Sequence, residues 1–197
     1  MAIEGSVLTN PSAAGSFTVT LPASNLQIVG IFHNLPYLQI DVSVGTKAIL
    51  PNLGTGYRRV IPINFTPGTN TLNMYAPAAG FVVVYYGTPL PGSRPLTAYL
   101  GIVVTASPTA AGTGSVTPSF PKGTGRLVGY SNYVTASYVE IAFNIATGKS
   151  ITFFDTNAEA LDGVGGVTPL NMALADTFTV TYTAGAALKF YAFFYYQ

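Results

Sequence analysis

The residues of this chain that could take part in chemistry are few. Its 197 residues include one histidine, no cysteine, seven carboxylates and eight lysines or arginines. His33 lies in GIFHNLPY, at a strand end before a turn, where a lone histidine is most often a surface or hydrogen-bonded turn residue. No Ser-His-Asp arrangement is suggested by the spacing, the GxSxG motif is missing, and no thiolate is available. We therefore expect a protein that is not an enzyme and that needs no cofactor.

One acidic segment, DTNAEALDG, has oxygen ligands at alternate positions, as the start of a calcium loop does. The glycine expected at the sixth position of such a loop and the glutamate expected at the twelfth are both absent. Asp155, Asn157, Glu159 and Asp162 are therefore only weak metal candidates. We expect no metal, and a capped turn with solvated carboxylates is the favoured interpretation.

The basic residues are scattered, apart from the patch Tyr57, Arg58 and Arg59 that opens a strand after a glycine turn. Charges at a sheet edge discourage unwanted pairing, whereas Tyr and Arg are enriched at binding hot spots. The patch is thus either an edge-strand safeguard or an interface anchor. With a formal net charge of only +1, the sequence predicts no nucleic-acid partner.

The elements that must carry these residues are strands. Apolar and polar residues alternate in SFTVTL (16–21), YLQIDVSV (37–44) and SYVEIAFNI (137–145), which is the pattern of half-buried strands. The expected strands are separated by segments rich in turn-forming residues, such as PNLGTG, TPGTN and PKGTG. These features predict an all-β protein.

Two sets of strands resemble each other along the chain. A shift of 99 positions places IVG (28–30) on LVG (127–129) and Asp41 on Glu140, and both sets finish on a strand ending in Tyr-Tyr. We expect two tandem, duplicated antiparallel β-sandwiches of jelly-roll type, although β-rich sequences also align by pattern alone. A single eight-stranded jelly roll is the structural alternative.

The expected boundaries follow from composition. The first unit covers residues 1–92, a Pro-rich connection with one strand at 97–105 covers 93–113, and the second unit covers 114–197.

The N-terminal segment has no apolar run, so we expect no signal peptide, and no apolar stretch is long enough for a transmembrane helix.

The scarcity of charge predicts association. Only 8% of the residues are charged, against roughly 25% in an average soluble protein. The last strand, KFYAFFYYQ, does not alternate, so we expect its second face to be covered by another copy or by the other half of the chain. The expected interface residues, besides the Tyr57 patch, end the two Tyr-Tyr strands: Tyr85, Tyr86, Phe194, Tyr195 and Tyr196.

In composition and strand pattern, the whole chain resembles the small β-sandwich and jelly-roll capsid or decoration proteins of bacterial and archaeal viruses. The resemblance rests on few charges, no cysteine and strands rich in Thr, Gly, Pro and Tyr, and it includes no diagnostic motif. It implies a structural virion protein that is made in the host cytoplasm and assembles with copies of itself and other virion proteins.

Two other functions are expected alternatives. One is a lectin-like or spike module that binds a glycan or receptor through the loop at 57–59 or the loop at 155–162. The other is a secreted β-pore or pilus-like subunit, which the missing signal peptide disfavours.

Overall fold

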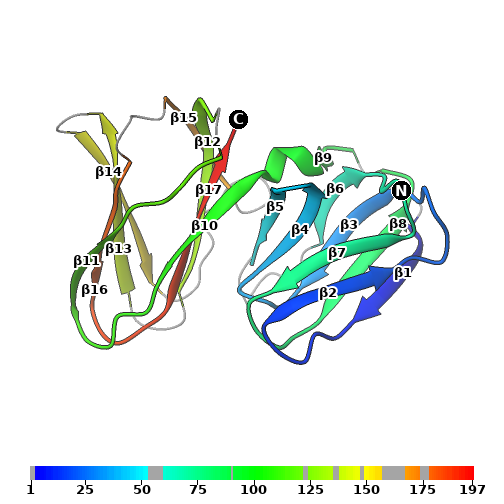
Figure 1. Cartoon of the computed structure of the whole chain (residues 1–197), viewed down its shortest axis with the longest axis horizontal. Coiled ribbons are helices and arrows are strands. Elements are labelled where there is room, and N and C mark those ends of the chain that lie inside the picture. The colour runs from blue at the N-terminus through cyan, green and yellow to red at the C-terminus, as the bar shows by residue number, and fades with distance from the viewer. Residues whose placement is uncertain are drawn as a thin grey trace. The chain divides into compact units, whose positions relative to one another are not determined.

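Strands make up nearly all the regular structure of the chain, as the alternating pattern predicts. The computed structural model divides the chain into two compact units, Met1–Leu100 and Gly101–Gln197 (Figure 1). In the described residues the only helix is the 3₁₀ turn η1, Leu96–Tyr99. The all-β prediction is therefore confirmed. The structure describes residues 3–52, 60–89, 91–121, 124–134, 138–146, 149–156, 167–173 and 178–197.

The first unit contains two antiparallel sheets. One has the order β1-β8-β3-β6 with the two-residue β9 added in parallel to β6, and the other has the order β2-β7-β4-β5. Their bounds are β1 Ile3–Thr9, β2 Gly15–Thr20, β3 Ile28–His33, β4 Tyr37–Ser43, β5 Thr46–Pro51, β6 Ile61–Phe65, β7 Thr71–Ala76, β8 Val82–Gly87 and β9 Arg94–Pro95.

The second unit also contains two antiparallel sheets, in the orders β10-β17-β12-β15 and β11-β16-β13-β14. Their bounds are β10 Gly101–Ala106, β11 Gly112–Val116, β12 Arg126–Val134, β13 Tyr138–Ala146, β14 Lys149–Thr156, β15 Thr168–Ala173, β16 Val180–Ala184 and β17 Phe190–Tyr196.

Apolar residues on alternate positions of the strands form the core of the first unit. Val19, Ile40 and Met74 from β2, β4 and β7 are at most 2% exposed, while the polar residues between them face outward. Ile31 and Val84, which are partners in the β3–β8 ladder of the other sheet, are fully buried. Burying these apolar side chains removes apolar surface from water and holds the unit together.

Aromatic rings form the core of the second unit. Phe194 in β17 packs against Tyr130 in β12 and against Phe178, with ring centroids 5.2 and 5.3 Å apart. Phe190 meets the ring of Tyr182 in β16 edge-on at 5.0 Å. Such tilted and T-shaped contacts add to the large area that each ring buries.

The two units share one strand order. Adding nine to each strand number turns 1-8-3-6 into 10-17-12-15 and 2-7-4-5 into 11-16-13-14. β9 and η1 have no counterpart in the described part of the second unit. The alternative of one eight-stranded sandwich for the whole chain is therefore wrong.

Each unit has the same irregularity at the same place. The β3 ladders shift register just before Gly30, and the β12 ladders shift just before Gly129. A Cβ on Gly30 would collide with the Val60 side chain, and a Cβ on Gly129 would collide with Val167. Both positions therefore exclude a larger residue for the same physical reason.

The residues opposite these glycines also correspond. Gly30 lies opposite Pro62 and Tyr85, as Gly129 lies opposite Pro169 and Tyr195.

Three details differ from the sequence expectation. The connection expected at 93–113 is divided between the units: η1 lies in the first and β10 begins the second, so the strand expected at 97–105 is in fact Gly101–Ala106. The alignment of Asp41 with Glu140 is two residues out. Ile40 pairs with Met74 and Ile141 pairs with Tyr182 at the equivalent place, which puts Asp41 level with Ala142.

Candidate functional site

Several residues predicted from the sequence fall outside what the structure describes. These are Tyr57, Arg58 and Arg59 of the basic patch and Asn157, Glu159 and Asp162 of the acidic loop. The backbone of Asp155 lies in β14, opposite Val139, but its side chain also falls outside the described part. Among the described residues, no three His, Asp or Glu side chains gather where they could hold a metal ion.

The predicted interface residues of β8 are half-buried in the first unit. Tyr85 and Tyr86 pair with β1 on one side and β3 on the other. A Cβ on Gly5 would collide with the Tyr86 hydroxyl, so this ring packs against the β1 backbone. The Tyr86 ring therefore contributes to packing within the first unit.

The predicted interface residues of β17 are buried. Phe194, Tyr195 and Tyr196 are at most 9% exposed, and all seven residues of β17 are buried. β17 lies between β10 and β12, so it has neighbours along both edges. This chain alone covers both faces of the strand, and no second copy is needed to bury it.

His33 is in the core, so of the two positions expected from the sequence, a surface residue or a hydrogen-bonded turn residue, the surface one is wrong. It is 6% exposed at the end of β3. Burial lowers the pKa of His33 from 6.5 to about 4, although the backbone of Leu35, Leu50 and Pro51 partly favours the charged form. Neither ring nitrogen has a partner at ordinary hydrogen-bond geometry among the described residues, so this opposing effect is the smaller one. The side chain is thus neutral at pH 7 and almost fully buried.

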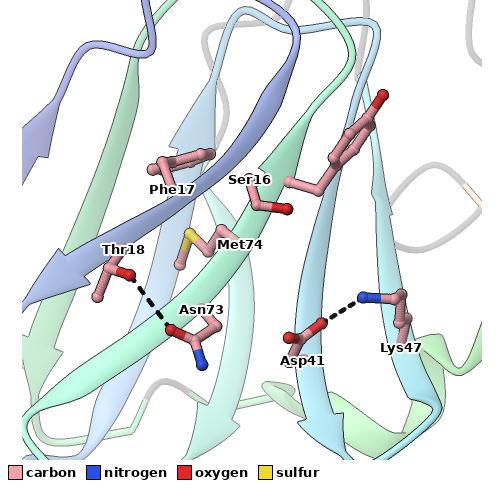
Figure 2. A pocket seen from close by; sticks show the side chains of 8 residues that line it. Ser16, Phe17, Thr18, Asp41, Lys47, Asn73 and Met74 are labelled. Carbon is pink, nitrogen blue, oxygen red and sulfur yellow. Dashed lines mark hydrogen bonds and ion pairs between the residues drawn. The ribbon is translucent and has the colours of Figure 1, made fainter.

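A hollow of about 220 Å³ lies on the outer face of the sheet β2-β7-β4-β5. Figure 2 shows the side chains that line the hollow, which come from neighbouring strands. It is lined by Ser16, Phe17, Thr18, Asp41, Lys47, Asn73, Met74 and Tyr75.

The ladder between the two central strands explains why the sheet opens here. β7 pairs with β2 over six residues, Thr71 to Ala76, and β4 pairs with β5 along almost its whole length. Between β4 and β7, however, only Gln39–Tyr75 and Ile40–Met74 are paired. The strands are unpaired beyond Ile40, and the hollow lies at that point.

Two polar pairs line the hollow from opposite sides. Lys47 Nζ donates to Asp41 Oδ1 at 2.6 Å, and the two side chains are 45% and 43% exposed. On the β2–β7 side, Thr18 Oγ1 donates to Asn73 Oδ1 at 3.2 Å (Figure 2). The site therefore offers a carboxylate, an ammonium, an amide and a hydroxyl, which suit hydrogen bonding.

Sequence reasoning found the outward direction of Asp41 but not the hollow. The alternation in YLQIDVSV put Asp41 on the polar face, and its 43% exposure agrees. No sequence signal states that β7 lies beside β4, or that their ladder stops after two pairs.

The comparisons with known proteins give no relative. No protein-family model matches this sequence, and no curated protein matches it. Within the described ranges, no helix has the length and apolar character needed to cross a membrane.

Proposed function

We propose that this protein is a structural component of a virus particle, a capsid or decoration subunit made of two duplicated jelly-roll sandwiches. The strand order shared by the two units carries this proposal. Eight antiparallel strands in which 1-8-3-6 face 2-7-4-5 have the winding of a jelly roll, a fold of viral capsid and lectin domains.

The matching irregularities support duplication beyond the strand order. A shift of the ladder, a glycine pressed against a valine and a facing proline all recur at one place in each unit. A sandwich can form without any of them, so their recurrence favours descent from one ancestral unit over a shared β-rich pattern.

The low charge favours a particle component over a free domain. With 15 charged residues among 197 (8 Lys or Arg and 7 Asp or Glu), little repulsion opposes association of like molecules. The partners on this proposal are copies of the chain and other virion proteins. Synthesis in the host cytoplasm and residence in the virion follow from the same role.

The edge strand β1 is the surface best suited to self-association, in place of the Tyr-Tyr strands. Among the described residues β1 pairs with β8 alone, so its other edge presents free backbone N–H and C=O groups. Ile3 and Leu8 on this strand are 43% and 60% exposed. Glu4 is its one charged residue.

Sedimentation velocity and negative-stain imaging of the purified chain test the proposal. We expect large oligomers or shells at neutral pH, and we expect Leu8→Lys to shift the protein toward monomers because it puts a charge on the edge. Val44→Lys is the matched control, since Val44 is likewise an exposed apolar residue but follows β4, which is in the other sheet from β1. A chain that stays monomeric at millimolar concentration contradicts the proposal. Equal loss of assembly in both variants contradicts the role of β1.

A further inference from the structure

We infer that the hollow on the β2-β7-β4-β5 sheet binds one sugar residue of an uncharged carbohydrate. This inference goes beyond the proposed structural role and does not depend on it. It rests on the charge, the hydrogen-bonding groups and the size of the hollow, and on a comparison between the two units.

The charge of the hollow favours a neutral ligand. Among the described residues that line it, Asp41 and Lys47 are the charged side chains, and they neutralise each other at 2.6 Å. A metal ion would find one described carboxylate, already bonded to an ammonium, where calcium takes six to eight oxygens. An anion would meet the carboxylate of Asp41 directly beside the Lys47 ammonium.

The hydrogen-bonding groups match adjacent hydroxyls. A sugar hydroxyl both donates and accepts, and the hollow offers acceptors on Asp41, donors on Lys47, and both on Asn73 and Thr18. Tyr75 adds a ring with an apolar face and a polar end, which suits the C–H face of a pyranose. The volume of about 220 Å³ is enough for a single sugar ring.

The equivalent strands of the second unit provide a comparison for this inference. At the positions equivalent to Thr18, Asn73 and Asp41 it has Ser115, Thr181 and Ala142. The β13–β16 ladder continues through this row, where Ala142 pairs with Thr181, and the Thr181 hydroxyl bonds to the Ala142 carbonyl at 3.4 Å.

The backbone partner of Ala142 on β14 is Thr152, where β5 of the first unit has Lys47. At this row the ladder of the second unit is closed, and the residues at the positions of Asp41 and Lys47, Ala142 and Thr152, carry no charge. The charged pair and the opening occur together in the first unit, so neither is required by the fold.

The position of the groups also suits a binding site. All the lining residues lie on β2, β4, β5 and β7, and strands hold side chains in place more rigidly than loops do.

Saturation-transfer NMR of the full chain tests the inference. The probes are millimolar glucose, galactose, mannose, fucose and N-acetylglucosamine, with glucuronate and sialic acid as charged comparisons. We expect at least one neutral sugar to bind with a millimolar Kd and the acidic sugars to bind more weakly. No signal from any neutral sugar, or preferred binding of the acids, overturns the inference.

Variants locate the site. Asp41→Ala and Asn73→Ala are each expected to weaken binding at least tenfold without changing the melting temperature by more than a few degrees. Thr20→Ala is the matched control, because Thr20 is exposed on β2 two positions beyond Thr18 but does not line the hollow. Equal binding by all three variants places the sugar elsewhere and overturns the assignment.

Discussion

The buried histidine makes the first unit sensitive to acid. His33 is neutral in the folded chain because burial lowers its pKa from 6.5 to about 4. In the unfolded chain it takes up a proton near pH 6.5. Between these two pH values the unfolded state binds more protons, so the free energy of unfolding falls as the pH falls from 6.5 to 4 and then levels off for this group.

The size of the effect follows from the same values. A pKa difference of 6.5 − 4, at 1.36 kcal/mol for each pH unit, corresponds to about 3 kcal/mol of stability lost. A domain of this kind has about 5–15 kcal/mol in total, so the loss is a large share of the stability of the first unit.

Urea unfolding at pH 7.5, 6.5, 5.5 and 4.5 measures this loss, with His33→Asn as the comparison. The second unit has Asn132 at the same position, since His33 pairs with Val82 as Asn132 pairs with Ala192. The variant is expected to lack most of the decline between pH 6.5 and 4.5. Carboxylates titrate in both proteins, so the difference between the two curves reports the histidine.

The chain contains a single histidine, which makes the assignment direct. Proton NMR of the His33 ring gives its pKa in the folded chain independently of stability. A measured pKa near 6.5, or parallel stability curves for the wild type and His33→Asn, refutes the reasoning.

The remaining predictions concern packing. Gly30→Ala is expected to destabilise the first unit by about 1–3 kcal/mol, and less when combined with Val60→Ala, because the new methyl group collides with that valine. Gly129→Ala and Val167→Ala should show the same coupling in the second unit, and additive effects in urea unfolding would contradict the close approach. Phe194→Ala is expected to cost about 3–5 kcal/mol of unfolding free energy. Lost assembly with unchanged stability would instead make Phe194 an interface residue.

The fold class and one point of internal alignment could be predicted from the sequence. Alternation of apolar and polar residues identified the strands, and IVG aligned with LVG at the position where both ladders shift. The alignment of Asp41 with Glu140 failed for a physical reason. Side chains alternate with a period of two, so a shift by two residues leaves every residue on its proper face and the pattern cannot detect it.

Whether a side chain is buried was harder to predict than which face of its strand it lies on. Because their strand does not alternate, Phe194, Tyr195 and Tyr196 were expected to be covered by another copy or by the other half of the chain. A central strand that its own unit buries on both faces has the same pattern. His33 was expected to be a surface or hydrogen-bonded turn residue because it precedes a turn, but it ends a strand whose buried positions continue to that residue. Neither outcome could be predicted without the strand order.

The ion pair in the hollow is not explained by stability. Asp41 and Lys47 are each nearly half exposed, and pairs of this kind contribute only about 0–1 kcal/mol. The second unit builds the same sheet with Ala142 at the position of Asp41 and closes its ladder there. An open ladder gives up backbone hydrogen bonds, and the weak ion pair does not compensate for them. The sugar site inferred above would account for both features, although Asp41 and Lys47 are also direct cross-strand partners in the β4–β5 ladder.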